Sequence, residues 1–448
     1  MSETTQRFEL SPLEEIERLS LDVAKERDLS PSQDEGSLEL RLIVSDLVAQ
    51  WRADFRRGIR AIDLTEPEAI IDRAMSNLTG YGPLTALLDD DDVWEIMLNA
   101  PDQIFVKRHR GPSGYHHESF HDDDHVLRTV TRIVDRSSGA HRALDPTSGL
   151  QDAQLDNGSR LHIVHGDIAR GGHMMVNIRK FTGMSFRTLD ELVASETLTI
   201  DGANFLRACV TSSLSMVFAG VPGAGKTTLL SCCAAELDPT LRVVIAEEVF
   251  EADVPLPNVA SMQTRGARPD RPGIDLRNLV AGFLRMAPDV AIVGEVRDRE
   301  ALPLMMTLSS GVTGMTTIHA GSARQALTRL RFVCQLAETS GDIPMAALND
   351  LVSQAIDVVV HTVRTPHGPR VNQISCVEDL TSAAGGTSFT MTDVFRRSPH
   401  TGRLEWTGNV PLRAGDQMAA FGIDIQTVLP HSARMPAPGV DQNHTGSS

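Results

Sequence analysis

The stretch from Gly220 to Thr227, which reads GVPGAGKT, constrains the fold more than any other part of this sequence. It fits the pattern G-x-x-x-x-G-K-[ST], in which glycines let the backbone turn its N–H groups toward an anion. An apolar run, Ser215–Ala219, precedes the stretch, and a helix-like run follows it. This order of strand, loop and helix predicts a phosphate-binding loop. The alternative is a glycine-rich turn without a ligand.

Each residue type in such a loop suits one task. A lysine at the position of Lys226 supplies a mobile positive charge for the β- and γ-phosphates, and the hydroxyl of Thr227 is a ligand for Mg²⁺. The expected ligand is therefore ATP or a close relative, bound with Mg²⁺. The residues predicted to contact it are Gly220, Val221, Pro222, Gly223, Ala224, Gly225, Lys226, Thr227 and Thr228.

Strand-like and helix-like runs alternate after about residue 196. The strand-like runs are Ser215–Ala219, Arg242–Ala246, Val290–Val293 and Thr316–Ile318, and a helix is expected over Leu276–Met286. Most of these strands are continuously apolar, which is typical of a parallel sheet that helices cover on both faces. The sequence therefore predicts an α/β domain around the phosphate loop.

The remaining segments differ from this domain in their residue pattern and composition. We expect a helical N-terminal extension over residues 1–60, opened by a capping box at Ser11 and Glu14, and an α+β N-terminal domain over 61–190 that contributes to the nucleotide site. An amphipathic helix is predicted over His125–Val134 within that domain. The α/β domain spans 191–380, and a C-terminal appendage with a disordered tail spans 381–448.

Carboxylates follow two of the predicted strands. Glu295 ends the run DVAIVGE, and Glu247, Glu248 and Glu251 follow Arg242–Ala246. The carboxyl ends of parallel strands meet at the sheet edge where ligands bind. Nucleotide hydrolysis needs a carboxylate near the metal and a group that orients water, so these residues are candidates for both tasks. Solvated carboxylates at strand ends are the alternative.

Composition argues against several classes of protein. The chain has 448 residues and a formal charge of −17, whereas proteins that grip a nucleic-acid backbone carry surplus Lys and Arg. No run approaches about 18 uncharged apolar residues, so no transmembrane helix is expected, and the opening residues do not resemble a secretory signal. The five cysteines form no CxxC pair, which favours buried thiols in a reducing cytoplasm.

Two polar clusters have weaker functional interpretations. The first could hold a metal, but it also reads as a polar loop before a helix that Asp124 caps. The second, in a Gly/Pro-rich loop, could face a neighbouring subunit's nucleotide or only solvent. Their residues are His116, His117, His121, Asp122, Asp123, Asp124 and His125 for the first, and Arg265, Arg268 and Arg271 for the second.

The order of motifs resembles one known family. The phosphate loop is followed by EEVFE, VGEVRDREA and MTTIHAGSA, and preceded by YGPLTALLDDDDVWEIMLNAPDQIFV, DNGSRLHIV and VNIRKF. This order is similar to the secretion ATPases of the type II/type IV superfamily, and most of all to the CpaF-like branch, which powers tight-adherence (Flp) pilus assembly. The resemblance covers about residues 80–380.

The resemblance implies a RecA-like ATPase domain and a homo-hexamer. Such a motor would lie at the cytoplasmic face of the inner membrane, on a platform protein of a pilus or secretion machine. Glu251 would assist the attacking water, Glu295 would act as the Walker B glutamate and metal ligand beside Thr227, and His319 would belong to a His box. Arg160 and Arg179 would reach the phosphates from the N-terminal domain.

This sequence departs from the family pattern at several positions. Gln154 stands where an arginine is usual, Val312 where a histidine is usual, and Glu248 where an aspartate is usual. These changes bear on turnover rather than on nucleotide binding. A nucleotide-gated scaffold with little turnover therefore remains as an alternative function. A nucleic-acid-stimulated motor on the same RecA-like core is the other alternative, and the charge of −17 and the 4% of aromatic residues argue against it.

Overall fold

The computed structural model describes residues 11–27, 29, 34–108, 111–136, 144, 147, 149–155, 158–180, 186–265, 271–336, 343–379 and 389–430. The chain divides into two compact units, Met1–Thr182 and Gly183–Ser448, which are described separately below. Within the described part of the chain, no helix combines the length and the apolar character needed to cross a membrane.

Three helices open the first unit: α1 (Pro12–Glu26), α2 (Asp34–Arg56) and α3 (Pro67–Thr79). The predicted capping box is present, because the Ser11 hydroxyl accepts from the Glu14 N–H and the Glu14 carboxylate accepts from the Ser11 N–H. Ile16, Leu40 and Ala74 lie in the small apolar core that the three helices share.

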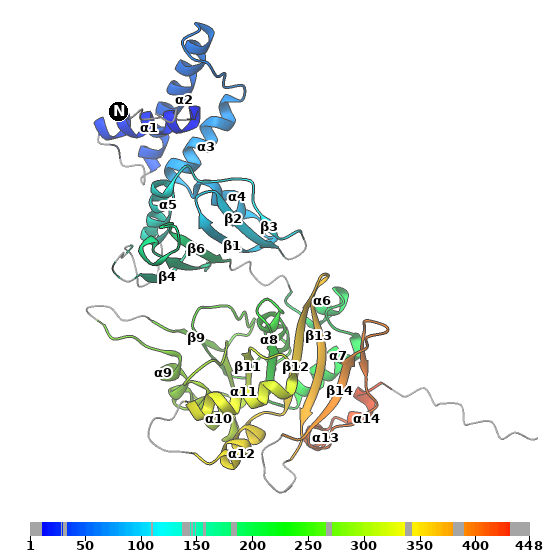
Figure 1. Ribbon diagram of the computed structural model, residues 1–448. Coiled ribbons are helices and arrows are strands. Elements are labelled where there is room, and N and C mark those ends of the chain that lie inside the picture. Colours follow the sequence, from blue (N-terminus) through cyan, green and yellow to red (C-terminus); the bar gives the residue numbers. More distant parts are fainter. Residues whose placement is uncertain are drawn as a thin grey trace, which may run out of the picture. The chain divides into compact units, whose positions relative to one another are not determined.

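A six-stranded antiparallel sheet completes the first unit (Figure 1). Its order is β3-β2-β1-β6-β5-β4. Val126, Val130 and Ile133 of α5 share a buried core with the sheet. The elements are η1 (Gly82–Leu84), α4 (Thr85–Asp89), β1 (Val93–Ala100), β2 (Gln103–Arg108), β3 (Gly114–Tyr115), α5 (Asp123–Arg136), β4 (Leu150–Gln154), β5 (Arg160–Val164), η3 (Gly166–Ile168) and β6 (Met175–Arg179).

The second unit is built on a nine-stranded sheet in the order β15-β14-β13-β12-β7-β11-β10-β8-β9. The strands from β12 to β9 are parallel, and β13, β14 and β15 join the β12 edge in antiparallel fashion. The strands are β7 (Met216–Gly220), β8 (Val243–Glu247), β9 (Val259–Gln263), β10 (Val290–Val293), β11 (Thr313–Ile318), β12 (Val358–Thr365), β13 (Gly368–Val377), β14 (Met391–Arg397) and β15 (Leu404–Trp406).

Helices cover both faces of this sheet (Figure 1). Along β7, Met216 and Phe218 enter one apolar core, whereas Val217 and Ala219 enter a second core on the opposite face. This arrangement confirms the α/β fold class. The helices are α6 (Leu189–Ala194), α7 (Ile200–Thr211), α8 (Lys226–Ala234), α9 (Leu276–Ala281), η4 (Phe283–Met286), α10 (Ala301–Ser309), α11 (Ala323–Leu336), α12 (Met345–Ala355), α13 (Leu412–Ala420) and α14 (Ile425–Val428).

Two features differ from the sequence-based expectations. The helix expected over Leu276–Met286 is divided into α9 and the short η4. Part of the segment 381–448, expected as an appendage, forms β14, β15, α13 and α14, and Phe395, Leu404 and Met418 enter a core of the second unit. The expected disordered tail lies outside the described residues.

All five cysteines are buried in the second unit, and none forms a disulfide. They pack as small apolar side chains, as their scattered spacing predicted.

Candidate nucleotide site

The loop between β7 and α8 has the backbone geometry that the motif predicts. Gly223 and Gly225 have φ values of +72° and +78°, in the left-handed region that glycine enters at no steric cost. A Cβ on Gly220 would lie 2.5 Å from the carbonyl oxygen of Thr362 in β12, so only glycine fits there. Because α8 begins at Lys226, its unpaired N–H groups and the positive end of its dipole lie at this loop.

Lys226 is buried and joins the loop to the end of β11. Its Nζ lies 3.3 Å from the carbonyl oxygen of Val221, to which it donates, and 3.2 Å from Nδ1 of His319. The same Nδ1 lies 3.2 Å from the carbonyl oxygen of Gly220. His319 therefore contacts both the first residue of the loop and its lysine.

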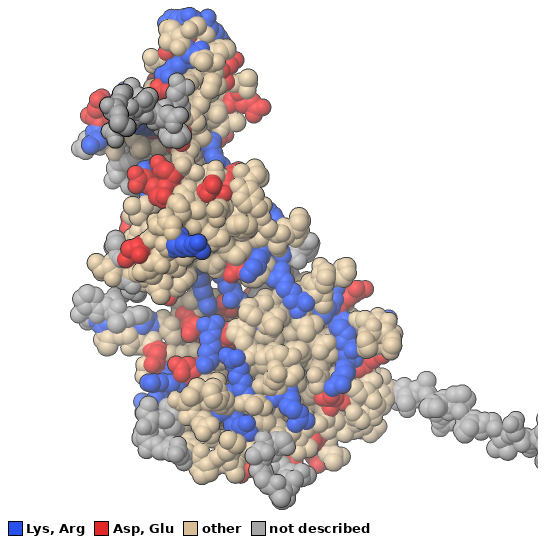
Figure 2. Space-filling view, in the orientation of Figure 1, with Lys and Arg blue, Asp and Glu red and all other residues tan. Residues whose placement is uncertain are grey.

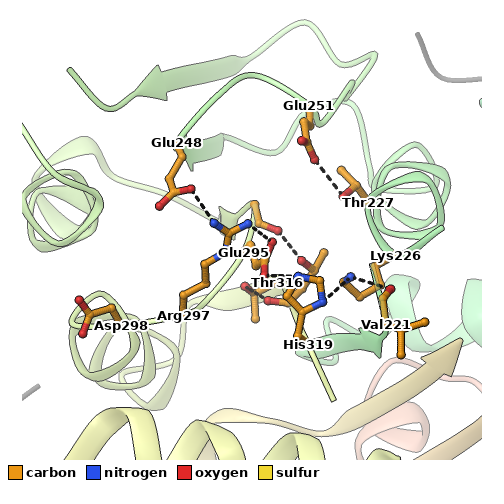
Figure 3. Close-up of polar contacts among 12 residues, drawn as sticks. Val221, Lys226, Thr227, Glu248, Glu251, Glu295, Arg297, Asp298, Thr316 and His319 are labelled. Atoms are coloured by element: carbon orange, nitrogen blue, oxygen red, sulfur yellow. Dashed lines mark hydrogen bonds and ion pairs between the residues drawn. The ribbon is translucent and has the colours of Figure 1, made fainter. Parts of the chain in front are cut away.

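His319 also contacts Glu295, which follows β10. Nε2 of His319 lies 2.8 Å from the Glu295 carboxylate, and Nη2 of Arg297 donates to that carboxylate over 2.7 Å (Figure 3). Burial alone would raise the pKa of Glu295, but the hydrogen bonds from His319 and Arg297 hold it well below its usual range. Glu295 is therefore an anion at neutral pH, suited to hold a cation.

Arg297 connects the two groups of carboxylates. Its Nη1 donates to Glu248 over 3.0 Å, while its Nη2 holds Glu295. The hydrogen bond to Glu295 raises the pKa of Arg297 further above its already high value. The sequence analysis did not single out this residue. It lies within the motif VGEVRDREA, two residues after Glu295, but no role was expected for it.

The segment after β8 presents Glu251 to the phosphate loop. The Thr227 hydroxyl lies 3.5 Å from Oε2 of Glu251 (Figure 3). The segment is fixed by the buried carboxylate of Glu247, whose Oε1 accepts the backbone N–H of Glu251 over 3.0 Å and that of Ala252 over 2.9 Å. The three glutamates thus differ in position: Glu247 holds the segment, Glu248 pairs with Arg297, and Glu251 lies beside Thr227.

The local structure explains why these groups meet. β7, β8, β10 and β11 are adjacent parallel strands, so the residues at their carboxyl ends share one sheet edge. Two threonine hydroxyls of β11 connect it to the end of β10. Thr317 donates to the carbonyl of Gly294 over 2.7 Å, and Thr316 donates to that of Val293 over 2.8 Å. The structure therefore brings Lys226, Thr227, Glu251, Glu295 and His319 to one place, by contacts within the second unit.

The other predicted residues belong to both units. Arg160 in β5 and Arg179 in β6 are cross-strand neighbours in the first unit. Val312 is half-buried against an apolar core of the second unit. Arg265 pairs with Ile274 through the backbone, and its Nη2 donates to the Pro272 carbonyl over 3.2 Å. Arg268 lies outside the described residues.

The histidine-rich segment has a structural role in the first unit. Nε2 of His121 lies 3.0 Å from Glu17 of α1, and its ring stacks on that of His125. Asp122, rather than Asp124, accepts from the backbone N–H of His125 at the start of α5, over 2.7 Å. Among the described residues, no group of three or more His, Cys, Asp or Glu side chains could hold a metal ion.

Comparison of the sequence with known proteins finds a family and several relatives. Residues 77–391 match the family model described as type II/IV secretion system protein. A Mycobacterium tuberculosis protein whose name links it to conjugal transfer is 30% identical over 314 residues, which cover 68% of this chain and 86% of that protein. The conjugal transfer protein TrbB of Rhizobium radiobacter is 27% identical over 310 residues, which cover 66% of this chain and 87% of TrbB.

A solved structure is also similar. The VirB11 ATPase of the Brucella suis type IV secretion system is 25% identical, covers 65% of this chain and 94% of its own, and gives a TM-score of 0.35. The family model matches well over half of the chain, so this protein belongs to the type II/IV secretion system protein family.

Proposed function

We propose that this protein hydrolyses ATP with Mg²⁺ at the loop Gly220–Thr227. The observation that carries the proposal is the convergence of a buried lysine, a hydroxyl, two carboxylates and a histidine at one sheet edge. The donor set fits a nucleotide: N–H groups and an ammonium suit phosphate, and hydroxyl and carboxylate oxygens suit Mg²⁺.

Each residue has a proposed task. Lys226 neutralises phosphate charge, and Glu251 orients the water that attacks. Mg²⁺, held by Thr227 and Glu295, would neutralise the charge that develops on the phosphates. His319 holds the side chains of Glu295 and Lys226 in position, because it contacts both. Arg160 and Arg179 remain proposed phosphate-binding cations.

The larger task of the protein follows from its family. Relatives carry names from conjugal transfer and from type IV secretion, as in PtlH of Bordetella pertussis. We assign this chain to the same kind of work, as a motor that moves pilus or secretion substrates, with the CpaF-like motif order favouring Flp pilus assembly. Its proposed working form is a homo-hexamer on an inner-membrane platform protein, at the cytoplasmic face.

The test is steady-state release of inorganic phosphate from Mg-ATP by the purified chain. Lys226→Ala should lower the rate by on the order of 100-fold, as expected for losing one preorganised cation. Lys25→Ala, at an exposed lysine of α1, is the matched control and should leave the rate unchanged. Equal background rates for the natural chain and Lys226→Ala would favour a nucleotide-gated scaffold. Strong, salt-sensitive stimulation by single-stranded DNA would favour a nucleic-acid motor.

A further inference from the structure

Helix α11 is cationic in a chain that is otherwise acidic. Between Ala323 and Leu336 it carries Arg324, Arg329 and Arg331 and no Asp or Glu, whereas the chain has a formal charge of −17. Figure 2 shows Lys and Arg side chains over the part of the second unit where Figure 1 labels α11. A helix with three cations and no acid in such a chain indicates a face that meets negative charge.

The outward face of α11 also exposes apolar side chains. Phe332 and Leu336 each have 56% of their surface exposed, and Met345 at the start of α12 has 43%. Single exposed apolar residues are ordinary, but here Phe332 and Met345 line one cleft. Aromatic residues, Met and Arg are the types that enrich protein interfaces, where Lys, Glu and Asp are depleted.

The cleft has a volume of about 460 Å³ and extends from the end of β11 along α11. His319, Ala320 and Gly321 line one end, and two arginines, Arg329 and Arg331, line the rest with Phe332, Met345 and neutral polar side chains. None of the described residues that line it is acidic. A volume of this size, within the range of binding pockets, can receive side chains of a docked segment.

One arginine of the cleft is available to a partner. Arg331 is already engaged, because it donates to Oδ1 of Asn349 over 3.0 Å and lies over the Phe389 ring. Arg324 donates to the Phe389 carbonyl over 2.7 Å. The Arg329 side chain is exposed and makes no hydrogen bond or ion pair with any residue that the structure describes. It is the cation that an incoming carboxylate would meet.

We propose that this cleft is the docking site for an acidic segment of a partner protein. A carboxylate of the segment pairs with Arg329, and an apolar side chain beside it packs against Phe332 and Met345. The concave shape and its apolar walls favour a polypeptide segment over a membrane surface, which meets proteins through convex apolar faces or Lys/Arg clusters.

The position of the cleft connects docking with the nucleotide site. His319, Ala320 and Gly321 line it, and His319 contacts Lys226 and Glu295. A side chain bound in the cleft would therefore contact His319, the residue that lies between Lys226 of the phosphate loop and the Glu295 carboxylate. This coupling rests on the proposed ATPase function, whereas the docking itself does not.

The test is a selection from a displayed library of random 12-residue peptides on the full chain. Selected peptides should be enriched in Asp and Glu next to Leu, Phe or Trp. A labelled selected peptide should bind about tenfold more weakly to Arg329→Glu and to Phe332→Ala, as expected for interface anchors. Arg403→Glu and Phe421→Ala change exposed residues of the same types away from the cleft, and they should bind the peptide like the natural chain.

Four outcomes would overturn the proposal. The first three are selected peptides without acidic enrichment, binding that the two cleft variants leave unchanged, and Arg329-dependent binding to phosphatidylglycerol vesicles in place of peptides. A change of oligomeric mass in Arg329→Glu would assign the cleft to a second copy of this chain and also overturn it. Because binding is read without turnover, a chain that binds the peptide but hydrolyses no ATP would refute the proposed function alone.

Discussion

Glu247 offers a stringent test of how the site is assembled, because it holds the backbone of the segment that carries Glu251. Its carboxylate is buried and accepts two N–H groups, from Glu251 and Ala252. Glu247→Gln keeps the shape of the side chain but removes its charge. A hydrogen bond to a charged group contributes about 1.5–3 kcal/mol and a neutral one about 0.5–1.5 kcal/mol, so each bond loses about 1 kcal/mol.

The expected loss of stability is therefore about 2 kcal/mol. In a unit of this size 1 kcal/mol lowers Tm by about 2–4 °C, so Glu247→Gln should lower the Tm of the second unit by about 4–8 °C. The loosened segment should also displace Glu251 from Thr227, which should lower Mg-ATP turnover about tenfold or more while nucleotide binding is kept. Differential scanning fluorimetry and phosphate release measure the two effects.

The matched control is Glu248→Gln, one residue away. Glu248 pairs with Arg297 at an exposed position, with 48% of its side chain accessible, so its loss should cost about 0.5 kcal/mol or less. If Glu247→Gln kept the natural Tm and the natural turnover, the inference that Glu247 positions Glu251 would be refuted.

Three further predictions concern Gly294, Arg297 and His121. Gly294→Ala would place a Cβ 2.9 Å from Cγ of Glu247, so it should reproduce the lower Tm and turnover of Glu247→Gln; a normal variant would show that Glu247 is free to move. Arg297→Ala should lower turnover more than Arg297→Lys, because only the guanidinium can hold two carboxylates at once, and equal rates would contradict this. Burial lowers the pKa of His121, but its pairs with Glu17 and Glu14 raise the pKa above 6.5 overall. The stabilisation of α1 by these pairs should therefore be complete below pH 6.5 and should be lost as pH rises through the folded-state pKa of His121. Hydrogen exchange of α1, corrected for intrinsic rates, should show this trend, and His121→Gln should abolish it.

The sequence predicted the parts of the structure that depend on local pattern. The strand, loop and helix around Gly220–Thr227 follow from a contiguous motif, and the apolar runs of β7, β8 and β10 follow from burial on both faces. The carboxylates could be assigned to one edge because parallel strands place their carboxyl ends together. The family was also predicted, from the order of motifs, and its model match confirms it.

The remaining features depend on tertiary contacts. Arg297 donates a hydrogen bond to Glu248, which is 49 positions away in the sequence. No local sequence pattern predicts that contact. Strand β14 and the edge strand β15 were not predicted, since β14 is only partly buried and β15 has three residues. Glu247 and Glu251 were grouped by sequence, but only the fold distinguishes the residue that holds the segment from the one beside Thr227.

The central claim is that Glu295 serves hydrolysis at a loop that binds nucleotide without it. The most direct measurement compares the natural chain with Glu295→Gln in ATP affinity and in Mg-ATP turnover on the same preparations. The account predicts an affinity within about threefold of the natural chain and a turnover lowered by on the order of 100-fold. An unchanged turnover would contradict the account.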